Sequence, residues 1–202
     1  AYEYAERNNL LPVSHDFEKD IIACAKSISK RYQGSKKRSE TLEQIALRIF
    51  DSMKKVHGLS KRDRLLLQIA TILHDCGKYI SMVELGECSY RIIMATEIIG
   101  LSHLEREIVA NVVKYNHIPF DYYEQMEKTT SMDKESYLRM TKLLAMLRLA
   151  NGLDRSHKQK FKNIRILPKE EQLLITVETN EDITLERGLF GHRAEFFTEV
   201  FN

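Results

Sequence analysis

The sequence predicts a mainly α-helical protein, a helical bundle followed by a small α+β element. Apolar residues recur at helical spacing through most of the first 157 positions, and capping residues stand at the ends of these runs. β-rich runs occur only in the last quarter of the chain. Of the 202 residues, 43% are hydrophobic, which is enough for an ordinary core. We expect a helical domain over residues 1–158 and an α+β element over residues 159–202.

The first two helices are predicted over residues 17–32 and 39–57. Asp16 precedes the first helix as a candidate cap, and Gly34 follows its end. The second keeps its apolar residues on one face and is followed by Gly58, a typical helix terminator. Both patterns are those of amphipathic helices packed against a core.

The next three helices are predicted over residues 61–74, 88–99 and 102–115. The first of them follows Ser60 and is almost entirely apolar toward its end, so it should lie at the centre of the bundle. The third begins with Ser102, in a capping-box pattern with a glutamate three residues later. A polar connection is expected over residues 121–133.

The longest helix is predicted over residues 135–157. The periodicity then changes, because residues 164–167 and 173–177 are rich in β-branched and aliphatic side chains. The intervening residues 168–172 are typical of a hairpin turn. A last helix is expected over residues 181–201, closing the α+β element.

Composition excludes several classes of protein. No apolar run approaches the about 18 residues of a membrane span, and the first residues lack the apolar core of a signal peptide. We therefore expect a cytoplasmic protein without a membrane partner. Cys24, Cys76 and Cys88 have no CxxC spacing, which argues against a disulfide framework or structural zinc. The chain starts without methionine, and we expect it to be a piece of a longer protein.

Basic residues are unevenly placed, although the net charge is only +2. They gather within residues 26–38, 54–64 and 155–165, and the last segment holds five basic side chains and no acidic one. Solvated helix faces could explain any one cluster. Three clusters in a near-neutral chain favour a polyanionic ligand.

His74 and Asp75 stand side by side where the apolar third helix ends. A divalent-metal phosphohydrolase needs imidazoles and carboxylates that converge on one point. The pair, with its preceding apolar helix, resembles the HD superfamily. More narrowly, the chain resembles the C-terminal region of the exopolyphosphatase and guanosine-pentaphosphate phosphohydrolase family. The segments that carry this narrower resemblance are 45–51, 66–75, 88–93, 100–107 and 147–157.

The resemblance also locates departures from the HD pattern. Arg38 occupies the position of the first ligand histidine, and Asn151 that of the closing aspartate. Asn116 replaces a further histidine, so His74 and Asp75 alone clearly remain. We expect a degenerate site without a metal, in which this pair forms a polar network with each other or with Arg38, Arg64 or Lys78. A metal held by His74 and Asp75 and direct phosphate contact are the alternatives.

The resemblance implies that hydrolysis belongs to N-terminal actin-like domains, which bind magnesium and are missing here. It implies no cofactor and no catalytic residue for this piece, which would be inactive by itself. Its implied roles are binding of inorganic polyphosphate or guanosine pentaphosphate, and dimerisation. An active metal-dependent HD phosphohydrolase acting on a nucleotide is one alternative. A nucleic-acid-binding helical module is another, but the basic clusters lack interleaved aromatic residues.

Five basic residues are the predicted polyanion contacts, because cations that neutralise a phosphate chain release its counterions. Arg148, Arg155 and Lys158 fall near one face of the predicted long helix and its continuation, and Lys160 and Lys162 follow.

Overall fold

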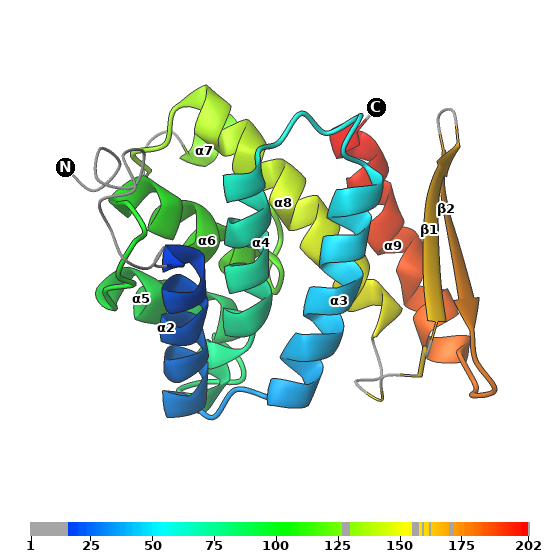
Figure 1. The fold of residues 1–202 in the computed structure, drawn as a ribbon, viewed down its shortest axis with the longest axis horizontal. Helices are drawn as coiled ribbons and strands as arrows, with labels where there is room; N and C mark the ends of the chain where they lie inside the picture. Colours follow the sequence, from blue (N-terminus) through cyan, green and yellow to red (C-terminus); the bar gives the residue numbers. More distant parts are fainter. Residues whose placement is uncertain are drawn as a thin grey trace.

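The computed structural model describes residues 16–126, 130–154, 158, 160–161, 163–169 and 172–201. Its architecture is a helical bundle flanked at one side by a β-hairpin and a final helix (Figure 1). The mainly α fold predicted from the sequence is confirmed. No helix among these residues is long and apolar enough to cross a membrane.

The bundle elements begin where polar side chains cap the first backbone amides. Asp16, Ser35, Ser60, Ser102 and Asp133 each accept a hydrogen bond from a backbone amide three residues ahead. The elements are α2 (Phe17–Arg31), α3 (Lys36–Ser52), α4 (Lys61–Leu73), the 3-10 helix η1 (Cys76–Tyr79), α5 (Leu85–Ala95), α6 (His103–Tyr115), α7 (Tyr123–Met126) and α8 (Lys134–Leu153).

Several boundaries differ from those predicted. Helix α3 starts three residues early because Ser35 caps it, and it ends at Ser52 rather than at residue 57. Helix α5 spans Leu85–Ala95 instead of residues 88–99, and the connection predicted over residues 121–133 contains the short helix α7. Helix α8 ends at Leu153 rather than at residue 157.

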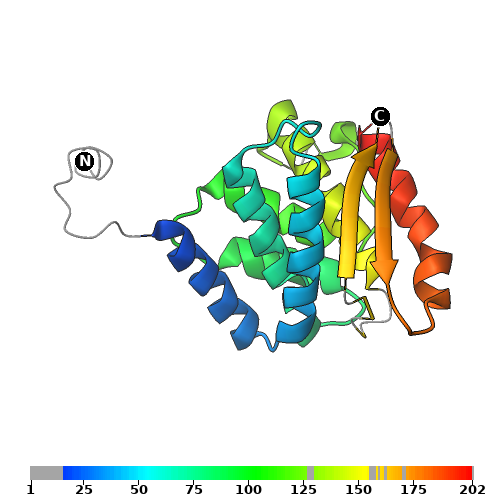
Figure 2. The same ribbon diagram turned by 45° about the vertical axis from the view of Figure 1, so that its right-hand side comes forward.

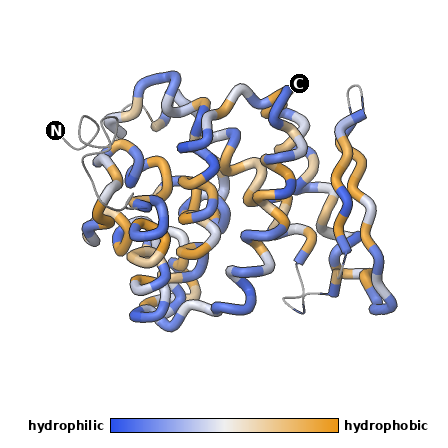
Figure 3. Tube along the Cα trace, in the orientation of Figure 1, coloured by the Kyte–Doolittle hydropathy of each residue, from blue (hydrophilic) through white to orange (hydrophobic). Residues whose placement is uncertain are grey.

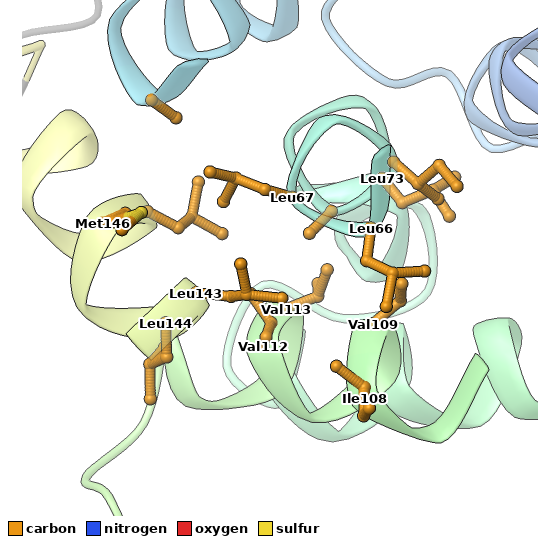
Figure 4. Close-up of a cluster of buried hydrophobic side chains, with 14 of the residues drawn as sticks. Leu66, Leu67, Leu73, Ile108, Val109, Val112, Val113, Leu143, Leu144 and Met146 are labelled. Atoms are coloured by element: carbon orange, nitrogen blue, oxygen red, sulfur yellow. The ribbon is translucent and has the colours of Figure 1, made fainter. Parts of the chain in front are cut away.

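Helix α4 lies at the centre of the bundle, as its apolar sequence predicts, and contacts α2, α3, α6 and α8. Leu66, Leu67 and Leu73 from α4 are fully buried among side chains of α6 and α8 (Figure 4). Hydrophobic and hydrophilic residues alternate along the bundle helices (Figure 3). Burial of one such leucine stabilises the fold by about 1.5–3 kcal/mol.

The α+β element consists of β1 (Asn163–Lys169), β2 (Gln172–Glu178) and α9 (Thr184–Phe201). The strands form an antiparallel hairpin in which Pro168 is paired with Leu173, so β1 extends into the segment predicted as a turn. Figure 2 shows the hairpin beside α3, with α9 on its other side. Arg48 Nη1 and Ser52 Oγ of α3 donate to the backbone carbonyls of Ile164 and Ile166.

Helix α9 packs closely on α8. Gly152 permits this approach, because a Cβ there would lie 3.2 Å from the side chain of Arg193 in α9. Gly152 is therefore a packing position between α8 and α9.

Candidate functional site

Four bundle elements bring the predicted HD positions together. Arg38 comes from the first turn of α3, His74 and Asp75 from the end of α4, and Asn151 from the last turn of α8. The end of α6 adds His117. These side chains line an open cavity of about 610 Å³, with Lys37 and Lys78 among its exposed lining residues. We call it the HD cavity.

The three residues predicted to replace HD ligands, Arg38, Asn116 and Asn151, are hydrogen-bonded to one another. Arg38 Nη2 donates to Asn151 Oδ1 at 2.6 Å, and Asn151 Nδ2 lies 3.4 Å from Asn116 Oδ1. All three residues are nearly buried, with exposed fractions of 9%, 4% and 1%. A short hydrogen bond from a guanidinium thus joins Arg38 and Asn151, the two residues that the sequence predicts at the first and last ligand positions of the HD pattern.

His74 is oriented by the backbone. Its Nδ1 lies 2.9 Å from the carbonyl oxygen of Thr71, and because a carbonyl can only accept, Nδ1 carries a proton. The backbone carbonyl of His74 accepts a hydrogen bond from His117 Nε2 at 2.6 Å. The Nε2 of His74 lies 3.7 Å from Asp75 Oδ2. His74 and Asp75, which the sequence predicts to be partners, therefore lie next to each other in the cavity wall.

Asp75 joins the end of α4 to the start of α3. Its Oδ2 accepts a hydrogen bond from the backbone amide of Ser35 at 3.2 Å. Its Oδ1 is buried and has no hydrogen-bond partner among the residues that the structure describes. Arg64, one of the partners considered from the sequence, instead binds Asp51 at 2.8 Å and takes no part in this site.

The cavity is positively charged near neutral pH. Many protein atoms surround the imidazole of His117, although part of the residue remains open to solvent. This burial lowers its pKa to about 4, against the opposing effect of the hydrogen bond to the His74 carbonyl, and the charges of the surrounding residues, Arg38 and Arg193 among them, lower it further. His117 is therefore neutral at pH 7. Among the charged lining residues, Lys37, Arg38 and Lys78 outnumber the single carboxylate of Asp75.

The donor set fits a divalent cation poorly. One imidazole and one carboxylate remain beside a guanidinium that stays protonated and offers no lone pair. Among the described residues, no group of three or more histidine, cysteine, aspartate or glutamate side chains could hold a metal. Cys76, next to the pair, is buried, and burial raises the pKa of its thiol to about 12, so it packs in the core.

The predicted polyanion contacts do not form one stripe. Arg148 donates to the backbone carbonyls of Tyr115 and Ile118 and lies 4.5 Å from the ring centre of Phe196. Burial, with a smaller effect of Arg193, lowers its pKa to about 10. Lys160 is bonded to the carboxylate of Glu186 at 3.1 Å and to the carbonyl of Asp182.

Lys158 is exposed, whereas Arg155 and Lys162 lie outside the described residues. Because α8 ends at Leu153, Lys158 is not held at a helical offset from Arg148. Sequence reasoning did not assign Ser35 to the site. Its cap position three residues before Arg38 was the available signal.

A family model described as Ppx/GppA phosphatase, domain III, matches residues 22–191. The chain belongs to the Ppx/GppA phosphatase family. The matched part includes every lining residue of the HD cavity and most of the α+β element. The family resemblance inferred from the sequence is therefore confirmed. Among curated proteins, none matches the chain.

Proposed function

We propose that this chain is a non-catalytic domain of a Ppx/GppA phosphatase that helps to bind inorganic polyphosphate or guanosine pentaphosphate. The observation that carries the proposal is the 2.6 Å hydrogen bond between Arg38 and Asn151 at the former metal positions. It supports a site in which the permanently charged guanidinium of Arg38 takes the place of a bound metal ion. Phosphoanhydride hydrolysis then belongs to magnesium-binding, actin-like domains outside the sequence given, in a cytoplasmic enzyme.

The reason is electrostatic. A catalytic divalent cation must be held by several neutral or anionic donors before it can activate water. Arg38 would repel such a cation from inside the site, and its contact with Asn151 removes that amide oxygen as a ligand. His74 and Asp75 alone are too few to compensate.

The basic residues at one end of the molecule support binding of a polyanion. The start of α3 and the end of α8 lie at this end (Figure 1). Lys36 and Lys37 at the start of α3 and Lys158 after α8 are exposed, and Arg155 and Lys162 are close in sequence. Each cation that neutralises a phosphate releases a counterion, so affinity should fall as salt rises.

Titration of fluorescently labelled polyphosphate at several salt concentrations tests this binding. The double variant Arg155→Gln with Lys158→Gln should weaken binding and reduce the slope of log K against log salt by roughly one unit for each phosphate that is no longer neutralised. Lys54→Gln with Lys55→Gln removes the same charge from another surface and is the matched control. Equal effects of the two pairs would reject the assigned surface.

Metal and phosphate measurements test the non-catalytic part. The purified chain, incubated with manganese, magnesium or iron, should release no phosphate from polyphosphate or nucleotides. Stoichiometric metal that is abolished by His74→Ala, together with hydrolysis, would instead make the chain an active HD phosphohydrolase. Stronger binding of single-stranded RNA than of polyphosphate would favour the nucleic-acid module.

Dimerisation belongs to the same proposal, because the resemblance implies it for this part of the enzyme. Sedimentation equilibrium should give twice the 23.6 kDa mass of the chain at micromolar concentration. A monomer over the whole concentration range would contradict dimerisation through this domain alone.

A further inference from the structure

We propose that His57 is a proton-sensitive latch, which holds the connection between α3 and α4 closed while its ring is neutral and releases it in acid. The connection spans residues 53–60 and joins the ends of α3 and α4 that lie away from the HD cavity (Figure 1). His57 is fully buried within it, with an exposed fraction of 0%. The bonding of both ring nitrogens, the charges around the ring and the surface that the connection covers support this role.

Both nitrogens of the His57 ring have partners that fix its tautomer. Nε2 lies 3.0 Å from the backbone carbonyl oxygen of Phe50, which can only accept a hydrogen bond, so Nε2 carries the proton. The backbone amide of Leu59 donates to Nδ1 at 2.8 Å, so Nδ1 carries no proton. The ring is therefore neutral, and it joins the last turn of α3 to the residue before Ser60, the cap of α4.

Protonation of the ring removes one of these two bonds. A second proton can bind only at Nδ1, where it turns the acceptor of the Leu59 amide into a donor. Two N–H groups would then point at each other, and the buried amide of Leu59 would have no acceptor. A buried donor without an acceptor is unfavourable, so protonation favours a conformation in which the connection opens and water reaches the ring.

Burial and a nearby cation disfavour the protonated ring while the connection is closed. Lys142 of α8 donates through Nζ to the backbone carbonyl of His57 at 2.7 Å, which brings an ammonium close to the imidazole. Burial is the larger effect, and together with Lys142 it lowers the pKa of His57 below 6.5, the ordinary value for histidine. The hydrogen bond to the carbonyl of Phe50 opposes this shift without cancelling it.

Two carboxylates also oppose the shift, but arginines bind both of them. Asp51 of α3 is paired with Arg64 at 2.8 Å, and Asp63 of α4 is paired with Arg139 at 2.7 Å. These pairs offset the negative charge that would otherwise stabilise an imidazolium. The ring therefore stays neutral near pH 7 although α3 and α4 each place an aspartate near it.

The connection covers apolar surface. Met53 at its start and Val56 in its middle line a cavity of about 770 Å³, which also borders the hairpin and α9. The other lining residues carry no charge, and most are apolar, among them Leu173 of β2 and Phe197 of α9. Displacement of the connection would uncover this lining. Release of the latch should therefore increase the binding of Nile red, an uncharged apolar dye.

Proton NMR and hydrogen exchange of the purified chain over a series of pH values test the latch. The His57 ring should titrate with a midpoint below 6.5. An open ring takes up its proton near pH 6.5, so the latch is complete above that pH and is lost as the pH falls toward the midpoint. Over this interval the protection of the Leu59 amide should fall about 10-fold for each pH unit. The amide of Leu67, inside α4, should stay better protected at each pH, because the opening is local.

The matched variant is His57→Asn, because the asparagine oxygen accepts from the Leu59 amide in place of Nδ1 but does not titrate. In this variant the protection of Leu59 and the binding of Nile red should no longer change over the same interval. His103→Asn replaces an exposed histidine at the start of α6 and should keep the wild-type pH profile.

A midpoint at or above 6.5 for His57 would overturn the proposal, and so would constant protection of Leu59 while His57 titrates. Equal protection of Leu59 and Leu67 would show unfolding of the whole chain instead of a local opening, and would overturn it too. A pH profile that persists in His57→Asn would assign the opening to another group. The wild-type titration decides the matter by itself if the variant does not fold.

Discussion

Replacement of Asn151 by leucine should destabilise the protein although both side chains have the same number of heavy atoms and branch at the same carbon. The substitution removes the acceptor of the 2.6 Å hydrogen bond from the buried Arg38 guanidinium. A hydrogen bond to a charged group contributes about 1.5–3 kcal/mol. The hydrogen bond with Asn116, at 3.4 Å, adds little. Burying leucine offsets about 1 kcal/mol of the loss, which leaves a net destabilisation of about 0.5–2 kcal/mol.

Urea denaturation followed by circular dichroism measures this difference, and the melting temperature should fall by about 1–8 °C for a chain of this size. Asn151→Asp is the matched control, because it keeps an oxygen for Arg38. Asn116 Nδ2, without a hydrogen-bond partner among the described residues, can turn toward the second oxygen. This variant should stay within about 1 kcal/mol of the wild type. A leucine variant as stable as the wild type would refute the energetic role assigned to the Arg38–Asn151 bond.

Three further outcomes follow from local environments. In a proton NMR titration His117 should titrate near its lowered pKa of about 4, and a midpoint near 6.5 would contradict its packing. Because the unfolded ring takes up its proton first, the stability due to neutral His117 is complete above about pH 6.5 and is lost as the pH falls toward 4. Burial raises the pKa of the Cys76 thiol to about 12, so this residue should react with a disulfide reagent only on unfolding. Rapid labelling of the native chain would exclude its core position. Gly77→Ala should cost about 3 kcal/mol or more in denaturation experiments, since the new Cβ would lie 2.4 Å from the carbonyl oxygen of Leu85. Gly188→Ala, with nothing within 4 Å in α9, should gain about 0.5–1 kcal/mol, and equal losses at the two sites would argue against the clash.

Helix boundaries were predictable where a cap and an apolar period agreed. Asp16 and Ser60 start α2 and α4 at the predicted residues, because each satisfies backbone amides locally. The start of α3 was predicted three residues too late, because three basic residues follow Ser35. Cations are unfavourable at the positive end of the helix dipole. Lys37 and Arg38 of this first turn line the HD cavity.

The convergence of Arg38, His74, Asp75 and Asn151 could be inferred only from the family resemblance, since these residues are up to 113 positions apart. Which cations are available to a ligand could not be inferred. Arg148 and Lys160 bind partners on other elements, and such tertiary contacts leave no periodic signal in the sequence.

The contact between α3 and the hairpin has a consequence for self-association through β-strands. An edge strand with unpaired backbone carbonyls can recruit a strand of another chain. On β1, Arg48 and Ser52 occupy the carbonyls of Ile164 and Ile166 that face away from β2. An incoming strand would have to displace both side chains before it could pair. Helix α3 thereby protects the hairpin from aggregation along this edge while it carries Arg38 in its first turn.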